Sequence, residues 1–217
     1  MWALPDSMLE VDQLACMRGD ALLFRDLSFR LDGGALLHVA GRNGAGKTSL
    51  LRLLCGLMLP EAGEIRWRGK PIRSQREEYH GELLYLGHAN AVKDEFSALE
   101  NLRVACAVAG RAVGETEALG ALDAIGLAHR IDLDARYLSQ GQRRRVALAR
   151  LLLAEAVPLW ILDEPFTALD APAVALLART IEAHLARGGA VIYTTHQDVR
   201  IASASVERID VGEFAPC

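Results

Sequence analysis

A helical segment opens with the residues Leu138-Ser139-Gln140-Gly141-Gln142, which combine two features of a phosphate-binding helix start. Ser139 and Gln142 have the spacing of a capping box, in which the serine caps the helix and the glutamine reaches back. Gly141 has no Cβ, so a ligand can approach its backbone closely. Such a helix start offers free N–H groups and the positive end of the helix dipole to an anion. The pattern also fits an ordinary capped helix, so other parts of the chain must decide between a phosphate-binding helix start and a helix that is only capped.

A second anion-binding stretch lies upstream, between a predicted buried strand and a predicted helix. It reads Gly41-Arg42-Asn43-Gly44-Ala45-Gly46-Lys47-Thr48 and matches the phosphate loop G-x-x-x-x-G-K-[ST] in full. Its glycines permit a tight turn that points backbone N–H groups at phosphate oxygens. We expect Lys47 to contact the β- and γ-phosphates, Thr48 to ligate Mg²⁺ and Ser49 to join the nucleotide site. The strand-loop-helix context favours nucleoside triphosphate binding over a chance match.

Two carboxylates, Asp163 and Glu164, follow the predicted buried strand at residues 159–162. Ligands of open α/β sheets bind at the carboxyl ends of strands, so this is a sensible place for chemistry. We expect Asp163 to hold Mg²⁺, directly or through water, and Glu164 to polarise the water that attacks the γ-phosphate. His196 follows the strand predicted at residues 190–194, and a γ-phosphate contact is expected there too. An acidic turn and a structural histidine are the alternatives, which the complete phosphate loop disfavours.

The order of predicted elements indicates an α/β fold with a helical insertion. Short strands are expected at residues 9–11, 22–24, 27–31, 35–40, 63–68, 83–86, 159–162 and 190–194, and helices at residues 48–57, 101–108, 115–125 and 142–154. Asp170 is expected to cap a further helix with Pro172 in its first turn. We therefore predict one domain of 217 residues, with a catalytic α/β core at 1–87 and 155–217 and a helical part at about 88–154.

The composition is that of a soluble globular protein, with 51% hydrophobic residues, 24% charged residues and a net charge of −4. The mildly acidic balance argues against a nucleic-acid partner. Two charged residues and a proline interrupt the most apolar region, 146–162, so no membrane span is expected. The cysteines lack metal-ligand spacing and indicate a reducing, cytoplasmic location: Cys16, Cys55, Cys106 and Cys217.

Several charged and aromatic residues have plainer interpretations. The arginines at 143–145 could suggest a nucleic-acid patch, but a solvated or phosphate-facing helix end is favoured. Four histidines are read as structural or exposed because they lack metal-ligand spacing: His38, His80, His129 and His184. Trp67 and Trp160 are read as core residues.

Taken in order, these motifs resemble those of the ATP-binding cassette (ABC) ATPases over nearly the whole chain. The resemblance makes 41–48 the Walker A loop, 138–142 the signature, 168–170 the D-loop and Asp163 the end of Walker B. It implies the ABC type of P-loop NTPase fold, with a mixed sheet core, an antiparallel β subdomain and a helical subdomain. The implied reaction is hydrolysis of ATP with Mg²⁺, with Glu164, His196 and Lys47 as the catalytic residues.

The same resemblance implies partners. In that family two cassettes pack head to tail, and each ATP lies between Walker A of one copy and the signature of the other. Ser139 and Gly141 would then touch the γ-phosphate of an ATP held by a second copy, with Gln142 beside them. Membrane-spanning transporter subunits are the other implied partners, which would place the chain peripherally at the cytoplasmic face of the bacterial inner membrane.

Three positions depart from the usual family pattern. Gln140 replaces a glycine of the signature, between the intact Ser139 and Gly141. His88 replaces the Q-loop glutamine, where it can donate a hydrogen bond or ligate Mg²⁺ through water. Arg18 stands where an adenine-stacking aromatic is expected, and a guanidinium plane can stack on a base.

A narrower resemblance, to the haem-exporter ATPases of cytochrome c maturation, is carried by residues 83–88, 98–102, 138–145 and 193–197 and by the departures at His88 and Arg18. That resemblance implies work on haem delivery or on the release of a haem-loaded chaperone. The alternatives are the ATPase subunit of another small ABC exporter, a soluble cassette protein outside transport, and a scaffold that binds ATP without hydrolysis. Retention of Lys47 and Glu164 argues against the scaffold.

Overall fold

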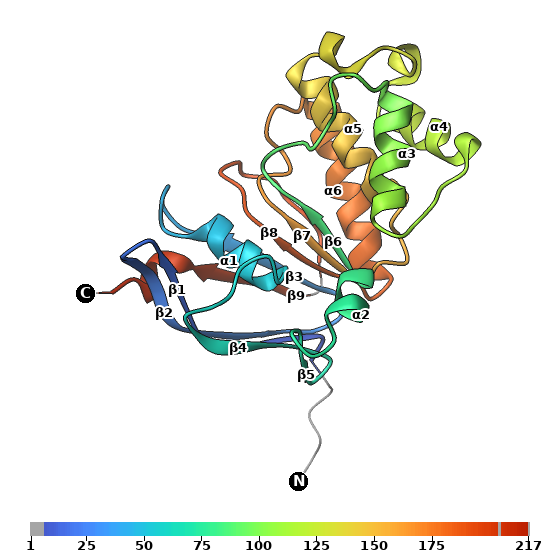
Figure 1. Ribbon diagram of the computed structural model, residues 1–217. Helices are drawn as coiled ribbons and strands as arrows, with labels where there is room; N and C mark the ends of the chain where they lie inside the picture. The colour runs from blue at the N-terminus through green and yellow to red at the C-terminus, as the bar shows by residue number, and fades with distance from the viewer. Residues whose placement is uncertain (1–6, 204, 217) are drawn as a thin grey trace.

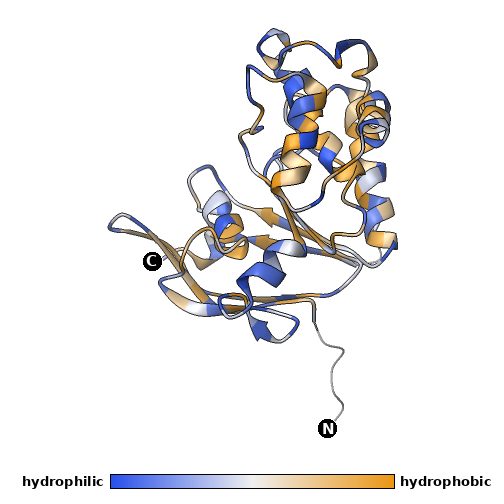
Figure 2. Cartoon of the chain, turned by 45° about the vertical axis from the view of Figure 1, so that its right-hand side comes forward, coloured by the Kyte–Doolittle hydropathy of each residue, from blue (hydrophilic) through white to orange (hydrophobic). Residues whose placement is uncertain are grey.

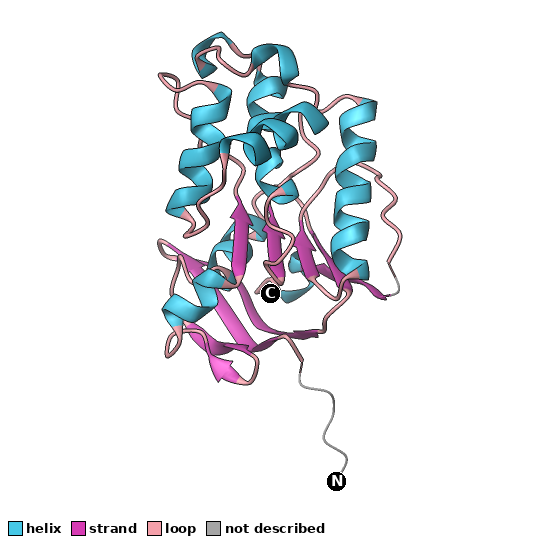
Figure 3. Cartoon of the chain, turned by 90° about the vertical axis from the view of Figure 1, so that its right-hand side faces the viewer, coloured by secondary structure: helices cyan, strands magenta, loops and turns pink. Residues whose placement is uncertain are grey.

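The computed structural model describes residues 7–203 and 205–216 and contains two β-sheets with a group of helices at one end (Figure 1). The antiparallel sheet, the parallel sheet and the helical group follow one another along the molecule, and Figure 3 shows the same arrangement from the side. This is the α/β fold class that the sequence predicts. Within the described residues, no helix combines the length and apolarity that a bilayer crossing requires.

The larger sheet has five strands in the order β6-β7-β8-β3-β9, and every neighbouring pair is parallel. Its strands are β3 (Ala35–Ala40), β6 (Leu83–Leu86), β7 (Leu159–Leu162), β8 (Ala190–Tyr193) and β9 (Ser205–Asp210). Every residue of β7 and β8 is buried, as expected for strands covered on both faces. Because parallel strands end at the same edge, the segments after β3, β6, β7 and β8 all start at one edge of this sheet.

The smaller sheet is antiparallel, in the order β2-β1-β4-β5. Its strands are β1 (Leu9–Arg18), β2 (Ala21–Leu31), β4 (Ala62–Trp67) and β5 (Lys70–Pro71). The prediction of two short strands at 22–24 and 27–31 was wrong, because pairing with β1 carries β2 through the intervening polar residues. The strand predicted at 9–11 likewise continues to Arg18. The register between the two strands shifts along their length, and Gln13 and Asp26 have positive φ angles of 46° and 56°.

Helix α1 (Lys47–Leu54) packs into the core that joins the two sheets. Its apolar residues recur at helical spacing and are fully buried: Leu50, Leu51, Leu53 and Leu54. The side chains of β7 alternate between two cores, with Leu159 and Ile161 in the core of α1 and Trp160 and Leu162 in the core of the remaining helices. Figure 2 shows the central strands mostly in the orange of hydrophobic residues. Because α1 is anchored in this core, the phosphate loop that precedes it is attached to a rigid helix.

The other helices pack on the second core. They are α3 (Ala98–Val108), α4 (Glu115–Ala124), α5 (Gln140–Leu152) and α6 (Ala171–Ala186), while the short α2 (Arg76–Gly81) precedes β6. Helices α4 and α5 lie within two residues of their predicted bounds. Helix α3 begins three residues before the predicted 101, because Ser97 and Glu100 form a capping box that the prediction overlooked.

The two predicted core tryptophans lie in the core, and three cysteines are buried as well. Cys16, Cys55 and Cys106 are buried and free, whereas Cys217 lies outside the described residues. Trp67 and Trp160 are at most 1% exposed.

Candidate functional site

The phosphate loop connects the end of β3 to the start of α1. The helix begins directly after Gly46, whose φ angle is 104°, and no side chain caps its free N–H groups. A Cβ at Gly46 would lie 3.2 Å from the Phe24 ring, so glycine serves both the left-handed backbone and the close packing. The first turn contains no acidic residue. Uncapped N–H groups at a helix N-terminus suit an anion such as phosphate.

Lys47 lies beside the loop that precedes it. Its Nζ donates to the Gly41 carbonyl at 2.7 Å and lies 3.4 Å from both the Arg42 carbonyl and His196 Nε2. Lys47 and His196 therefore meet although they are 149 residues apart in the sequence.

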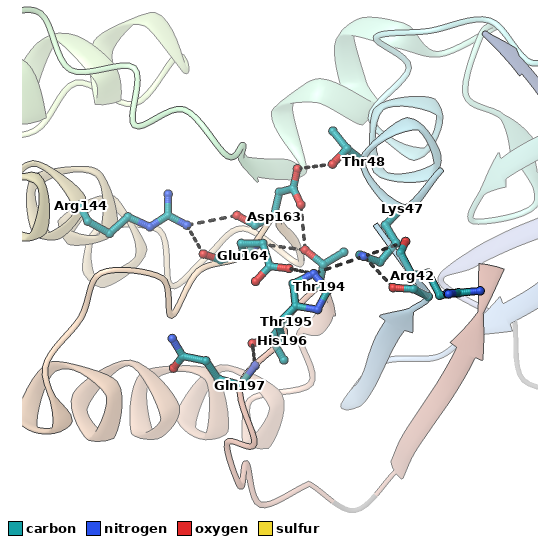
Figure 4. Close-up of polar contacts among 11 residues, drawn as sticks. Arg42, Lys47, Thr48, Arg144, Asp163, Glu164, Thr194, Thr195, His196 and Gln197 are labelled. Atoms are coloured by element: carbon teal, nitrogen blue, oxygen red, sulfur yellow. Dashed lines mark hydrogen bonds and ion pairs between the residues drawn. The ribbon is translucent and has the colours of Figure 1, made fainter. Parts of the chain in front are cut away.

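Behind the loop, Asp163 takes part in a chain of hydrogen bonds (Figure 4). The Thr48 hydroxyl donates to Asp163 Oδ2 at 2.9 Å, and the Thr194 hydroxyl donates to Asp163 Oδ1 at 2.8 Å. The backbone N–H of Glu164 donates to the same Thr194 oxygen at 2.8 Å. One hydroxyl thus joins the two carboxylate residues. The sequence prediction missed Thr194, whose only signal is a polar residue at the end of an otherwise apolar strand.

Glu164 directs its carboxylate toward His196. Glu164 Oε1 lies 3.4 Å from His196 Nε2, and the Glu164 side chain is 14% exposed. This oxygen is buried and accepts no hydrogen bond from any described residue. Buried carboxylate oxygens generally find a donor, so the position suits a proton of water or of a ligand.

A cavity of about 450 Å³ lies between these groups, a size suited to a small-molecule ligand. Its lining contains most of the residues predicted for the site: Asn43, Gly44, Gly46, Lys47, Thr48, Ser49, Asp163, Glu164 and His196. It also contains two of the three residues at which the chain departs from the usual pattern, Arg18 and His88, and three that were not predicted, Leu23, Thr167 and Gln197. The predicted Gly41, Arg42 and Ala45 lie in the same loop without lining the cavity.

The cavity suits Mg²⁺ as a bound ion. The Thr48 hydroxyl and the Asp163 carboxylate are hard oxygen ligands, and Mg²⁺ typically takes one or two protein ligands beside phosphates and water. Among the described residues, no group of three or more His, Cys, Asp or Glu could enclose a metal by itself. The metal role of His88 stays a prediction.

The predicted capping box at the start of α5 is present. Ser139 Oγ accepts from the Gln142 N–H at 3.2 Å, and Gln142 Oε1 accepts from the Ser139 N–H at 2.9 Å. A Cβ on Gly141 would lie 2.8 Å from the Ala168 carbonyl, so the helix start touches the 168–170 segment. None of these three predicted site residues lines the cavity. The structure of one chain therefore does not bring them to the phosphate loop.

The expectation that the arginines at 143–145 form a solvated or phosphate-facing helix end was wrong for Arg144, which is 3% exposed. Its guanidinium group lies among carbonyl groups at the end of β7 instead. Arg143 pairs with Asp94, and Arg145 pairs with Asp170 at 2.6 Å. Neither the three consecutive arginines nor the apolar residues after them indicate in the sequence that the second arginine faces inward.

Three of the remaining histidines make contacts that fit the predicted structural role. His184 is buried and stacks on Trp160 with ring centroids 3.8 Å apart, and burial lowers the pKa of His184 to about 4. His38 stacks on Tyr193, and burial lowers the pKa of His38 as well. His80 lies within hydrogen-bond distance of the Cys55 carbonyl.

Comparison with known proteins agrees with this geometry. The model of the family described as ABC transporter matches residues 24–167. The cytochrome c biogenesis ATP-binding export protein CcmA of Aromatoleum aromaticum is 62% identical, covering 90% of this chain and 91% of its own. The protein of the same name from Dechloromonas aromatica is 56% identical, covering 94% of this chain and 100% of its own. A solved ATP-binding subunit of an ABC transporter is 27% identical with a TM-score of 0.81, covering 95% of this chain and 87% of its own.

Proposed function

This chain belongs to the ABC transporter family and hydrolyses ATP, and we propose that it does so as the ATPase subunit of a membrane transporter of cytochrome c biogenesis. The observation that carries the proposal is the meeting of the phosphate loop, two carboxylate residues and His196 around one cavity. A site with these groups can bind a triphosphate, hold Mg²⁺ and activate water.

The phosphates of ATP would bind at the start of α1, against its free N–H groups and the Lys47 ammonium group. Thr48 and Asp163 would hold Mg²⁺, which neutralises charge on the β- and γ-phosphates. Thr194 keeps the Asp163 carboxylate in place through its hydroxyl group.

Glu164 would position the attacking water and accept its proton, because its carboxylate is nearly buried and one oxygen lacks a donor among the described residues. The oxygen of that water bonds to the γ-phosphorus while the bond to the bridging oxygen of ADP breaks. His196, which lies beside Glu164, would contact the γ-phosphate. ADP and inorganic phosphate are the products.

We propose that a second copy of this chain completes the site. Ser139 is exposed at the start of α5, and Ser139, Gly141 and Gln142 are absent from the lining of the chain's own cavity. In a head-to-tail pair these residues would close over the ATP of the partner copy. The two copies of such a pair are related by a twofold axis, which is the commonest symmetry among soluble homo-oligomers.

The transported species and the membrane partners are proposed from the names of the relatives. Two relatives that are 56–62% identical are named cytochrome c biogenesis export proteins. We therefore propose haem delivery or haem-chaperone release as the work done, at the cytoplasmic face of the inner membrane. The segment of about 88–154 would form a helical subdomain that docks on the membrane subunits, with His88 coupling it to ATP and Arg18 beside the base.

The test compares Glu164→Gln with the unsubstituted chain. The variant should bind ATP within about threefold of the normal affinity and hydrolyse it at least about 100-fold more slowly, because it lacks the proton acceptor. Nucleotide titration and phosphate release measure the two properties. Glu61→Gln, at an exposed position outside the cavity, is the control and should hydrolyse ATP normally. Normal turnover by Glu164→Gln would contradict the assignment.

A further inference from the structure

Arg144 is an interior cation on the first turns of α5, five residues after Ser139. Its side chain runs from the helix into the end of the parallel sheet, beside Asp163 and Glu164 (Figure 4). Burial of a charged group is costly unless hydrogen bonds compensate, so such a residue needs a reason for its position.

The guanidinium group of Arg144 is fully satisfied by neutral acceptors. Nε donates to the Pro165 carbonyl at 3.4 Å. Nη1 donates to the Gly87 carbonyl at 3.3 Å and to Asn90 Oδ1 at 3.0 Å. Nη2 donates to the carbonyls of Asp163 at 3.1 Å and Glu164 at 2.7 Å. These contacts use all five donors of the side chain.

The contacts join three segments that are distant in the sequence. One is α5, which starts with the signature residues. Another is the loop after β6, where Gly87 and Asn90 flank His88. The third is the turn after β7 that carries Glu164. All three segments also contribute to one small hollow beside the main cavity, which Arg144, His88 and Glu164 line together.

Glu164 needs restraint from outside its own turn. Its φ angle is +51°, in the left-handed region that residues with a Cβ rarely adopt. Thr194 accepts from the Glu164 N–H, and Arg144 donates to the Glu164 carbonyl at 2.7 Å. The two bonds hold the backbone on both sides of the residue, and so they fix the point from which the carboxylate extends.

We propose that Arg144 is a positioning residue of ATP hydrolysis, which fixes the Glu164 backbone and the His88 loop against the signature helix of the same copy. The inference rests on the proposed function. It gives α5 two tasks: Ser139 serves the ATP of the second copy, whereas Arg144 serves the Glu164 of its own copy.

The first test uses Arg144→Met and Arg144→Lys, with Arg150→Met as the control on the same helix. Arg144→Met should keep ATP affinity within about threefold, since Arg144 does not touch the phosphate loop, and should lower kcat about 10- to 100-fold. Arg144→Lys should restore only part of kcat, because an ammonium group has three donors in place of a planar fork of five. Arg150→Met should keep kcat within about twofold. Melting temperatures show whether each variant is still folded at the temperature at which kcat is measured.

The second test places Arg144→Met in the Glu164→Gln background. If Arg144 acts through the Glu164 carboxylate, Arg144→Met should slow the residual single-turnover rate by less than about threefold there. An equal slowing in both backgrounds, or normal kcat for Arg144→Met, would overturn the inference. An unsubstituted chain that does not hydrolyse ATP would instead overturn the proposed function, and the inference with it.

Discussion

The Thr194 hydroxyl is completely buried and serves two partners, donating to Asp163 Oδ1 and accepting from the Glu164 N–H. Thr194→Val keeps the shape of the side chain but removes the hydrogen bonds of the Glu164 N–H and of Asp163 Oδ1, while Thr48 still donates to Asp163 Oδ2. We expect a loss of about 1–3 kcal/mol in the free energy of unfolding, and a higher Mg²⁺ concentration for half-maximal hydrolysis. Urea unfolding and Mg²⁺ titration of phosphate release measure these effects. Thr194→Ser keeps the hydroxyl and is the control; identical behaviour of the two variants would contradict this role.

The residues that we propose to bind a ligand directly were predictable, because Lys47 and Asp163 stand in motifs whose chemistry can be read from the sequence. Residues that act through a neighbour were not. Thr194 follows β8, and Arg144 stands between two other arginines. Their roles depend on which way a side chain points, and that is decided by the packing of β7 against α5 and β8.

At the scale of elements, helices α3 and α5 begin with capping boxes of the same geometry. Ser97 and Ser139 each accept a hydrogen bond at 3.2 Å from the N–H three residues later. Ser97→Ala should lose about 1 kcal/mol of stability and leave hydrolysis per folded molecule unchanged. Ser139→Ala should lose a similar amount and also hydrolyse ATP more slowly, because the proposed site of the second copy uses its hydroxyl. Melting curves and phosphate release measure stability and hydrolysis for the two variants. Equal hydrolysis rates for Ser97→Ala and Ser139→Ala would contradict the proposed contact of Ser139 with the ATP of the second copy.

The elements themselves were predictable where periodicity is strong. The apolar spacing of α4 and α5 placed them within two residues, and the unbroken apolar residues of β7 and β8 indicated strands, which the structure shows to be fully buried. The extent of β1 and β2 was not predictable. Their polar residues alternate poorly, and pairing across the antiparallel sheet decides where each strand ends.

At the scale of the molecule, the parallel sheet brings loops that are distant in the sequence to one edge. The phosphate loop follows β3, Glu164 lies just after β7, and His196 lies just after β8. The helical group holds Ser139 at an exposed position away from the cavity that these loops form. We therefore propose that one chain is half of each of two ATP sites, and that a second copy supplies the missing half.

Pairing of two copies around ATP is tested by the mass in solution of Glu164→Gln with ATP and Mg²⁺, measured by light scattering. Slow hydrolysis should hold the closed pair together, so the expected mass is twice the 23.6 kDa of a single chain. Lys47→Ala, which should not bind ATP, is the control and should not pair in response to ATP. A Glu164→Gln variant that binds ATP yet stays at 23.6 kDa would show that a second copy does not complete the site.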